Sequence, residues 1–331
     1  MTDFQQLFAS LREVKVVVIG DVMLDTYWWG KVDRISPEAP VPVVALDKKE
    51  QRIGGAGNVA LNTASLQAET TIFSVVGDDA DADALIGLLQ DAHIDTKYII
   101  KSSSRITTNK TRIMSRNQQM MRLDAEVTAD ISEEDENAMV ESFQHFVKRY
   151  QPSVVIFEDY NKGVLTESLI SKIIHISRDN NIVTTVDPKR KNFFAYKDVD
   201  IFKPNLKEVR EGLNLINEAV NLESLKLIHE QLHAKLSHKI SLITLSEMGV
   251  FFQKGSGAKL IPSHLRNIAD VSGAGDTVIA VASLVYAATK DVRLATETAN
   301  IAGGLVCEEV GTAAINPKKL LDECCLLLEE K

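Results

Sequence analysis

The sequence predicts an α/β fold in which helices cover both faces of a doubly wound, mostly parallel sheet. Two observations carry this prediction. Short apolar, β-branched runs alternate with longer segments of helical periodicity, and several runs end in a polar residue. Such strand ends deliver side chains to one edge of a parallel sheet. The apolar runs span residues 14–19, 71–76, 154–157, 182–186 and 240–244, and helical patterns span 80–92, 132–149, 165–179 and 221–237.

Two segments, 22–49 and 96–124, interrupt this alternation because they are strand-like and mixed in polarity. Alternate residues of a strand share a face, so Lys110 lies beside Arg112, and Arg122 lies beside Asp124. We expect these segments to form a small β-sheet lid on a single domain that spans residues 1–331. Exposed strands also pair with other chains, so we expect a homodimer through the lid.

The composition is that of an ordinary globular protein, with 45% hydrophobic and 25% charged residues among 331. A net charge of −9 argues against nucleic-acid binding, which needs a basic face. No apolar run reaches the length of a membrane span, and the N-terminus lacks the apolar core of a signal peptide. The three cysteines, Cys307, Cys324 and Cys325, do not suit a disulfide framework. We therefore expect a cytoplasmic protein without membrane partners.

The most informative segment is 270–277, Asp-Val-Ser-Gly-Ala-Gly-Asp-Thr, which precedes an apolar run over 278–288. A glycine-rich turn that opens into a helix presents unpaired backbone N–H groups, and these form an anion site. The carboxylate of Asp276 lies inside that site. This placement suits a base that takes a proton from a group attacking phosphorus. The alternative is that Asp276 only caps the helix.

A second glycine-rich segment, Gly54-Gly55-Ala56-Gly57-Asn58, leads into a helix expected over 59–66. Paired glycines allow close approach to a ligand, and the Asn58 amide offers a donor and an acceptor, as polyol recognition requires. The spelling Gly55-x-Gly57-x-x-Ala60 also fits a dinucleotide fingerprint. That interpretation is disfavoured because the first strand does not run into this loop.

Two further turns follow strands and are candidates for nucleotide contacts. After Pro204, Asn205 is a good N-cap, and Glu208 lies one turn into the helix, where it can hold water around Mg²⁺. The segment 244–249 is a tight turn that can border an adenine or a phosphate. The chain has no Walker A motif, so nucleotide binding rests on the anion site at 270–277.

One competing motif is His229-Glu230-Gln231-Leu232-His233, which matches the HExxH pattern of zinc hydrolases. Leucine and isoleucine recur around it at three- and four-residue spacing, which is typical of an amphipathic helix packed on a sheet. We expect the histidines and Glu230 to lie toward solvent, with zinc as the disfavoured alternative.

The two glycine-rich segments, in this order and separation, resemble those of the ribokinase-type (PfkB-like) carbohydrate kinase family. The resemblance is closest to the branch that phosphorylates D-glycero-β-D-manno-heptose 7-phosphate. It implies a ribokinase-like fold, an ATP-dependent kinase and a C1 product, the 1,7-bisphosphate, on the route to ADP-heptose for the lipopolysaccharide inner core. The segments that carry the branch resemblance are 20–25, 34–43, 115–119, 122–124, 159–163 and 187–189.

The resemblance also implies roles for individual residues. Asp276 is the expected base for the anomeric hydroxyl, and Asp270 with the Ser272 carbonyl resembles a monovalent-cation site suited to K⁺. The residues implied for ATP, Mg²⁺ and the transferring phosphoryl group are Gly273, Ala274, Gly275, Asn205, Leu206, Lys207, Glu208, Thr244, Ser246, Gly249 and Asn300. Those implied for the sugar are Asp25, Gly54, Gly55, Asn58, Asp124 and Asp187.

Charge alone suggests that the sugar's 7-phosphate is held by cations of the lid or of strand ends, namely Lys110, Arg112, Arg122 and Lys162. Three departures from the family accompany these expectations. Ser246 stands where many members carry glycine, Glu158 stands where a small residue is usual, and the chain ends at Lys331. Many relatives fuse a nucleotidyltransferase domain there, so we expect a separate nucleotidyltransferase partner. The alternatives are a kinase for another sugar or sugar phosphate, and a non-catalytic sugar-binding regulator.

Overall fold

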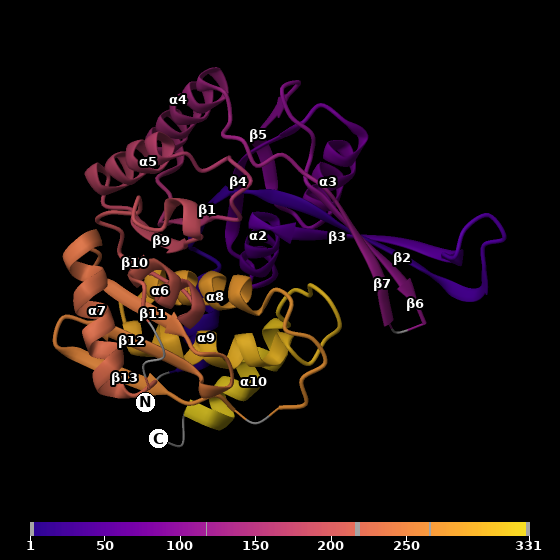
Figure 1. Ribbon diagram of the computed structural model, residues 1–331. Helices are drawn as coiled ribbons and strands as arrows, with labels where there is room; N and C mark the ends of the chain where they lie inside the picture. The colour runs from indigo at the N-terminus through magenta and orange to yellow at the C-terminus, as the bar shows by residue number, and fades with distance from the viewer. Residues whose placement is uncertain (1–2, 117, 216–218, 265, 329–331) are drawn as a thin grey trace.

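The computed structural model describes residues 3–116, 118–215, 219–264 and 266–328, and these form two sheets with helices around the larger one (Figure 1). The larger sheet has nine strands in the order β13-β12-β11-β10-β9-β8-β1-β4-β5. Seven neighbouring strands from β5 to β11 run parallel, whereas β12 and β13 pair antiparallel. The strands are β1 (Lys15–Gly20), β4 (Glu69–Gly77), β5 (Asp95–Ser102), β8 (Val154–Glu158), β9 (Val183–Asp187), β10 (Ile201–Phe202), β11 (Ile240–Thr244), β12 (Val250–Lys254) and β13 (Gly257–Ile261).

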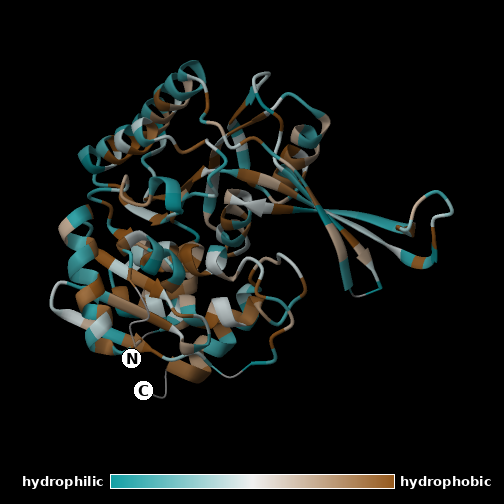
Figure 2. Ribbon diagram, in the orientation of Figure 1, coloured by the Kyte–Doolittle hydropathy of each residue, from teal (hydrophilic) through white to brown (hydrophobic). Residues whose placement is uncertain are grey.

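Helices cover both faces of this sheet, as predicted. Alternate residues of β1 enter two different cores: Val16 and Val18 join one, and Val17 and Ile19 join the other. One face carries α1 (Phe4–Leu11), α2 (Ala56–Ser65), α3 (Ala80–Asp91), α8 (Ala274–Thr289), α9 (Val292–Val306) and α10 (Pro317–Leu328). The other carries α4 (Glu133–Tyr150), α5 (Glu167–Asp179), α6 (Leu206–Leu213) and α7 (Leu222–Leu236). Figure 2 shows hydrophobic strands inside and mainly hydrophilic outer faces on α4 and α5.

The predicted small sheet is present, with strand order β3-β2-β6-β7. Strand β2 pairs antiparallel with β3 and parallel with β6, and β6 pairs antiparallel with β7. The β2–β3 hairpin projects well beyond the main body (Figure 1). The four strands are β2 (Val22–Ile35), β3 (Pro42–Gly55), β6 (Asn109–Ser115) and β7 (Gln118–Ala125).

The expected bounds of the small sheet were wrong at one end, because residues 96–102 belong to β5 at the edge of the main sheet. The ring of Tyr98 stacks on Phe73 of β4 at 4.5 Å between centroids, which draws this strand onto the main core. An edge strand also exposes alternate polar residues, so its composition resembles that of a projecting strand.

The parallel register gathers polar residues at the carboxyl edge of the main sheet. Gly20 pairs with Glu158, and Glu158 pairs with Asp187. A Cβ at position 20 would lie 1.9 Å from the Glu158 carbonyl oxygen, so only glycine fits there. The chain therefore brings β1, β8 and β9 to one place, which the N-terminus of α8 also faces. In the described part of the chain, none of the helices is long and apolar enough to cross a bilayer.

Candidate active site

Asp276 lies in the first turn of α8, where its side chain is buried with both carboxylate oxygens in hydrogen bonds. The side-chain amide of Asn58 in α2 donates to Oδ2 at 2.8 Å. The hydroxyl of Tyr160, which follows β8, donates to Oδ1 at 2.8 Å. The N-cap of α8 is instead Gly273, with φ of 78°. The carboxylate of Asp276 therefore points into the site and does not cap its own helix.

Burial raises the pKa of Asp276, although the hydrogen bonds from Asn58 and Tyr160 lower it. Asp187 raises the same pKa further, and the Lys203 ammonium lowers it. The net shift is upward. A carboxylate with a raised pKa accepts a proton more readily, as a general base must.

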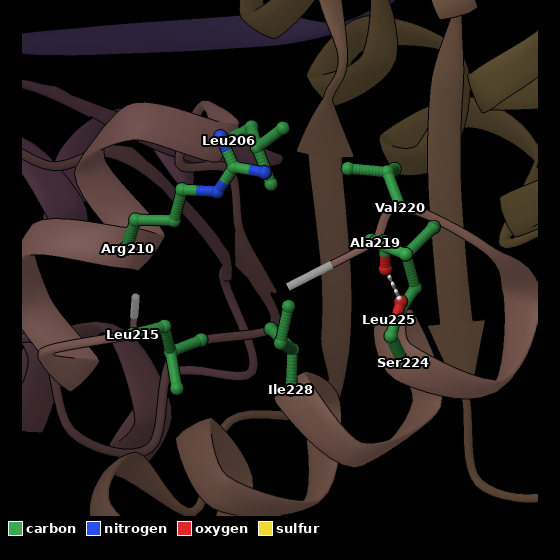
Figure 3. A pocket seen from close by; sticks show the side chains of 8 residues that line it. All are labelled: Leu206, Arg210, Leu215, Ala219, Val220, Ser224, Leu225 and Ile228. Carbon is green, nitrogen blue, oxygen red and sulfur yellow. Dashed lines mark hydrogen bonds between the residues drawn. The ribbon is translucent and has the colours of Figure 1, made fainter. Parts of the chain in front are cut away.

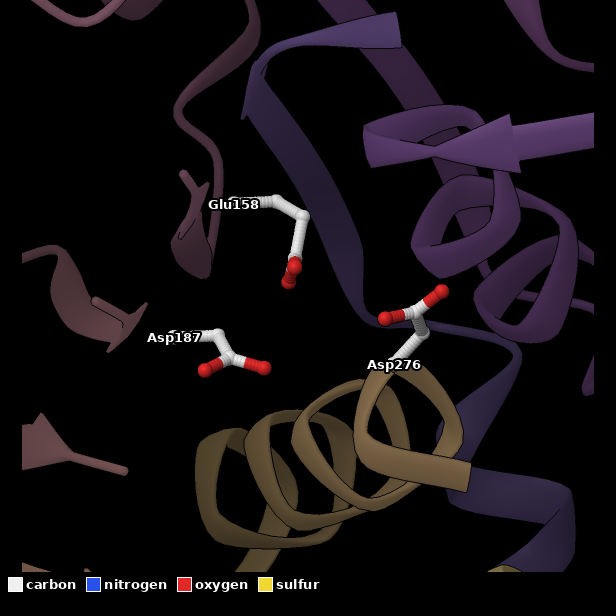
Figure 4. A group of neighbouring side chains, drawn as sticks. All are labelled: Glu158, Asp187 and Asp276. Carbon is white, nitrogen blue, oxygen red and sulfur yellow. The ribbon is translucent and has the colours of Figure 1, made fainter. Parts of the chain in front are cut away.

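Asp276 forms a compact group with Glu158 and Asp187, in which one carboxylate oxygen from each lies within 4.8 Å of the others (Figure 4). Glu158 is fully buried, and neither of its carboxylate oxygens has a hydrogen-bond partner among the residues that the structure describes. Burial raises the pKa of Glu158 well above its usual range, and the charges of Asp187 and Asp276 add to that rise. This side chain is therefore positioned to receive a proton, a hydroxyl donor or a cation.

Two lysines form ion pairs with Asp187. Lys203 is 2% exposed and places its Nζ 2.8 Å from Asp187 Oδ2. Lys189 lies 3.5 Å from Asp187 Oδ1 and 2.7 Å from Glu208 Oε1. Burial opposes ionisation of Asp187, but Lys189 and Lys203 outweigh it and lower the pKa of this carboxyl. Lys189 thereby connects the carboxylate group to the first turn of α6.

Asn205 and Glu208 form a capping box at the start of α6. The Glu208 N–H donates to Asn205 Oδ1 at 2.9 Å, and the Asn205 N–H donates to Glu208 Oε2 at 2.8 Å. The predicted N-cap is confirmed. Each Glu208 oxygen has one partner and, with two lone pairs, retains capacity for another. The carboxylate is thus held rigidly beside Lys189.

Leu206 and Lys207 point away from the carboxylate group that Asn205 and Glu208 adjoin. Lys207 is exposed and approaches Glu211 at 3.9 Å, whereas Leu206 lines a cavity between α6 and α7. That cavity holds about 10 Å³, room for no more than one water, and is lined by Leu206, Arg210, Leu215, Ala219, Val220, Ser224, Leu225 and Ile228 (Figure 3). A larger hollow of about 290 Å³ lies against α5. Neither is lined by Asp276, so neither contains the carboxylate group.

The turn after β11 lies beside the start of α6, as an isolated parallel bridge joins Thr244 to Asn205. Ser246 has φ of 56°, in the left-handed region that glycine adopts without strain. This conformation agrees with the expectation that many family members carry glycine at that position. Gly249 has φ of 96°, and a Cβ there would lie 2.0 Å from the Ile261 carbonyl oxygen. Asn300 donates its amide to the Pro262 carbonyl at 2.8 Å, so it anchors α9 to the segment after β13.

Asp25, Gly54 and Gly55, which are expected to bind sugar, come together where β2 and β3 pair. Of the other expected residues, Asn58 lies in α2, Asp124 on β7 and Asp187 on β9. A Cβ on Gly54 would lie 2.3 Å from Asp25 Oδ2, so the close approach requires glycine. Gly55 has φ of 60°, and its position lets α2 begin directly after β3. Asp25 is buried and forms an ion pair with Arg112 of β6. The Arg112 guanidinium is therefore already paired with the Asp25 carboxylate.

The remaining expected phosphate ligands differ in their surroundings. Arg122 is exposed on β7 and pairs with Asp124 at 2.8 Å. Lys162 pairs with Glu126 at 2.7 Å. Lys110 is partly buried, and its Nζ lies 5.6 Å from the centre of the Tyr160 ring. Burial and the neighbouring charge of Lys162 lower the pKa of Lys110. The structure thus brings Lys110 to the Asp276 side of the site and leaves Arg122 in solvent.

Asp270 is held by hydrogen bonds at the loop before α8. Its Oδ1 accepts from the Ser272 N–H at 2.9 Å, and its Oδ2 accepts from the Gly311 N–H at 3.0 Å. Burial opposes ionisation, but these bonds prevail and lower the pKa of Asp270. The carboxylate is therefore a stable anion, and its role toward a monovalent cation stays a prediction.

The HExxH helix differs from expectation at one position. Glu230 and His233 are exposed, but His229 is buried, and its Nδ1 lies 2.8 Å from Ser241 Oγ. His238 shares that hydroxyl through its Nε2 at 2.6 Å. Burial lowers the pKa of His229 to about 4 and that of His238 to about 3. These rings are neutral packing residues, and His229 and His233 do not belong to the ligand group that gathers among the described residues.

Several residues that shape the site escaped the sequence analysis. Tyr160, Lys189 and Lys203 contact the carboxylate group, and buried Asp21 accepts the backbone N–H groups of Tyr160, Lys162 and Val164 at 2.8–3.0 Å. The available signal was positional: each lies at or just beyond the carboxyl end of a main-sheet strand. Their partners could not be read because they come from distant strands.

A buried carboxylate at a helix N-terminus, with lysines and a capped carboxylate nearby on a doubly wound sheet, defines the class of phosphotransferases that act on an alcohol group. Residues 14–319 match the family model described as "pfkB family carbohydrate kinase", and the chain belongs to that family. It is therefore a kinase of sugar hydroxyls. The predicted family and fold are confirmed.

The chain is similar to curated proteins named "Bifunctional protein HldE". It is 40% identical over 310 residues to that of Methylobacillus flagellatus, covering 94% of this chain and 63% of the relative. Identity is 37% over 320 residues with the protein of Geobacter sulfurreducens, covering 96% and 64%. The chain thus spans somewhat under two thirds of these relatives.

Solved structures share the fold at low sequence identity. Arabidopsis thaliana ribokinase complexed with ribose and ATP superposes with a TM-score of 0.72 at 17% identity, covering 93% of this chain and 98% of that one. Escherichia coli phosphofructokinase-2 in complex with fructose-6-phosphate gives 0.77 at 16% identity, covering 94% and 99%. The likeness extends over nearly the whole of each chain.

Proposed function

We propose that this protein transfers the γ-phosphoryl group of ATP to the anomeric C1 hydroxyl of D-glycero-β-D-manno-heptose 7-phosphate. The observation that carries the proposal is Asp276, held between Asn58 and Tyr160 at the N-terminus of α8. The carboxylate there is held by two hydrogen bonds and lies next to backbone N–H groups that favour anions.

In the proposed reaction, the C1 oxygen forms a bond to the γ-phosphorus as the bond from that phosphorus to the ADP oxygen breaks. Asp276 accepts the hydroxyl proton. The backbone of Gly273, Ala274 and Gly275 stabilises negative charge on the transferring group, and Lys203 adds a buried positive charge close by. A Cβ on Gly275 would lie 3.7 Å from Lys203 Nζ, which shows how near this cation is to the anion site.

The carboxylates beside the base suit a hard divalent cation. Glu158 has two buried oxygens without partners, and Asp187 and Glu208 are connected through Lys189. Oxygen ligands of this kind fit Mg²⁺, which binds few carboxylates and keeps most of its waters. We assign Mg²⁺ to Asp187 and Glu208, where it would neutralise charge on the ATP phosphates. Asn205 and Thr244 complete the proposed nucleotide side, with K⁺ at Asp270 as a further proposal.

The sugar side is assigned to residues of the small sheet, of α2 and of the loop after β8. Asp25, Gly54, Gly55 and Asn58 are proposed to hold sugar hydroxyls, and Lys110 with Lys162 is proposed to hold the 7-phosphate. Burial and the charge of Lys162 lower the pKa of Lys110, so a bound phosphate dianion would favour the charged form of Lys110. Heptose phosphate as substrate is supported by the branch-specific segments and by the similarity to HldE proteins.

The small sheet is also the proposed dimer surface. Exposed apolar side chains lie along it: Trp28, Ile35, Val41, Leu46, Met120, Met121 and Leu123. A monomer gains nothing from a row of apolar groups on a projecting sheet, whereas pairing would bury them. Light scattering should give twice the chain mass for the wild type and a monomer for Leu46→Lys combined with Met121→Lys. A separate nucleotidyltransferase partner stays a prediction.

The test is ATP consumption, with Mg²⁺ present, on D-manno-heptose 7-phosphate, ribose, fructose and fructose 6-phosphate. Turnover confined to the heptose phosphate is the expected result. Turnover on another sugar would retain the kinase and overturn the substrate. Absence of turnover on all four sugars, with ATP binding retained, would favour the sugar-binding regulator.

A further inference from the structure

We infer that Tyr160 positions the base: its hydroxyl fixes Oδ1 of Asp276 and favours the charged form of this buried carboxylate, an inference that rests on the proposed role of Asp276. The hydroxyl is 2.8 Å from Oδ1, on the side opposite the Asn58 amide. With one donor on each oxygen, the carboxylate plane cannot rotate. Each oxygen keeps a second lone pair for the substrate hydroxyl.

The backbone around Tyr160 is unusually well fixed. Asp21, at the end of β1, accepts the N–H groups of Tyr160 and Lys162 with one oxygen and that of Val164 with the other. Asp159 is held in turn by the Tyr196 hydroxyl at 2.8 Å. A loop with this many internal acceptors places the Tyr160 ring without help from a ligand.

Two cations lie close to the Tyr160 ring. Lys110 Nζ from the small sheet is 5.6 Å from its centre, and Lys189 Nζ from the segment after β9 is 5.5 Å from it. The Tyr160 side chain therefore lies beside Lys110 and Lys189 and donates a hydrogen bond to Asp276. Loss of the hydroxyl alone leaves both ring contacts in place, which makes the hydrogen bond separately testable.

The need for such a donor follows from the charges that face Asp276. Burial and the charge of Asp187 from β9 oppose its ionisation, and a carboxylate oxygen of Glu158 from β8 also lies within 4.8 Å. Lys203 and the donors Asn58 and Tyr160 favour it. Burial and the Asp276 charge raise the pKa of Tyr160 well above its usual range, so the phenol keeps its proton and remains a donor.

The test is Tyr160→Phe, with Ser168→Ala as the matched control because it removes another hydroxyl that donates to a carboxylate, that of Glu136, away from Asp276. For Tyr160→Phe, the acid limb of the kcat profile should move upward by about one pH unit, and kcat at neutral pH should fall about 10- to 100-fold. The KM for ATP should stay within about twofold. The control should keep the wild-type acid limb.

A second measurement does not depend on turnover. The Asp276 carboxyl resonance, assigned by its loss in Asp276→Asn, should titrate at higher pH in Tyr160→Phe than in the wild type. An unchanged Asp276 titration would overturn the inference, as would an acid limb identical to that of the wild type. If Asp276→Asn retains full turnover while the titration still shifts, the contact is upheld and the proposed role of Asp276 as base fails instead. Thermal unfolding of Tyr160→Phe and Ser168→Ala checks that each variant is folded.

Discussion

The Asn58 side chain donates to Asp276 Oδ2 over 2.8 Å and so joins the two glycine-rich segments of a chain in which they lie 218 residues apart. The contact depends on Gly273, because a Cβ there would lie 2.7 Å from Asn58 Nδ2. A residue expected to contact sugar thus also orients the proposed base. A change that displaces Asn58 should therefore disturb both the proposed sugar contacts and the proposed base.

The first prediction concerns the base. Asp276→Asn should lower kcat by at least about 10²- to 10⁴-fold, because the amide cannot accept the hydroxyl proton. ATP affinity, measured by calorimetry, should change little, since the backbone N–H groups remain. The control is Asp79→Asn at the N-cap of α3, which should cost some stability and leave kcat unchanged. Comparable turnover in the two variants would contradict the assignment of Asp276.

Glycine substitutions distinguish backbone strain from a steric clash at the site. Gly273 and Gly255 both have positive φ, 78° and 55°, but a Cβ at 255 meets nothing within 4 Å. Gly255→Ala should therefore cost only the left-handed penalty, about 1–2 kcal/mol, with normal kcat. Gly273→Ala should cost more in unfolding free energy and lower kcat at least about tenfold by displacing Asn58.

Equal kcat losses in these two variants would show that general destabilisation, and not the Asn58 contact, limits turnover. Urea unfolding and steady-state kinetics on the same preparations provide both quantities. Gly275→Ala completes the series, because its Cβ would make only ordinary contacts at 3.6 and 3.7 Å. Its unfolding free energy should change least at this turn.

The phosphate ligand can be identified by comparing two cations of the small sheet. Lys110→Gln should lower kcat/KM for the sugar phosphate about 10- to 100-fold, since a hydrogen bond to a charged group is worth about 1.5–3 kcal/mol. Arg122→Gln should have less than about a threefold effect, because Arg122 is exposed and already paired with Asp124. The unphosphorylated sugar should respond equally weakly to both changes. A larger loss for Arg122→Gln would reverse the assignment.

Local sequence patterns were enough to predict most of the parallel strands of the main sheet, several of its covering helices and the start of a helix near Asp276. Apolar runs and glycine-rich turns encode these features within a few residues, as at 14–19 and 270–277. The pairing of residues 96–102 was not predictable in this way, since it depends on Tyr98 meeting Phe73. His229 is buried for a similar reason, because its partner Ser241 lies on the next strand.

The polar contacts within the site were the least accessible to sequence reasoning. Glu158 looked like an excess charge near the site, yet the register of β8 between β1 and β9 aligns it with Gly20 and Asp187. A carboxylate beside two others is intelligible only once the strand order is known. Burial and the nearby charges of Asp187 and Asp276 then predict that the pKa of Glu158 is raised.

Glu158 should make stability depend on pH in a distinctive direction. Burial raises the pKa of Glu158 above its value in the unfolded chain. Its contribution to folding stability is therefore fully present below about pH 4.5 and is lost as the pH rises through the folded-state pKa. Glu158→Gln should therefore gain stability relative to the wild type on going from acid to neutral pH, by about 1–3 kcal/mol.

Glu136 provides the opposite case within the same chain. Burial opposes its ionisation, but Lys172, Ser168 and Thr166 donate to its carboxylate and lower its pKa. Its contribution is therefore present above about pH 4.5 and is lost as pH falls, so Glu136→Gln should lose stability relative to the wild type as pH rises. Urea unfolding of both variants between pH 4 and pH 8 should give differences of opposite sign. Parallel curves for the two would show that Glu158 is not an unpaired buried charge.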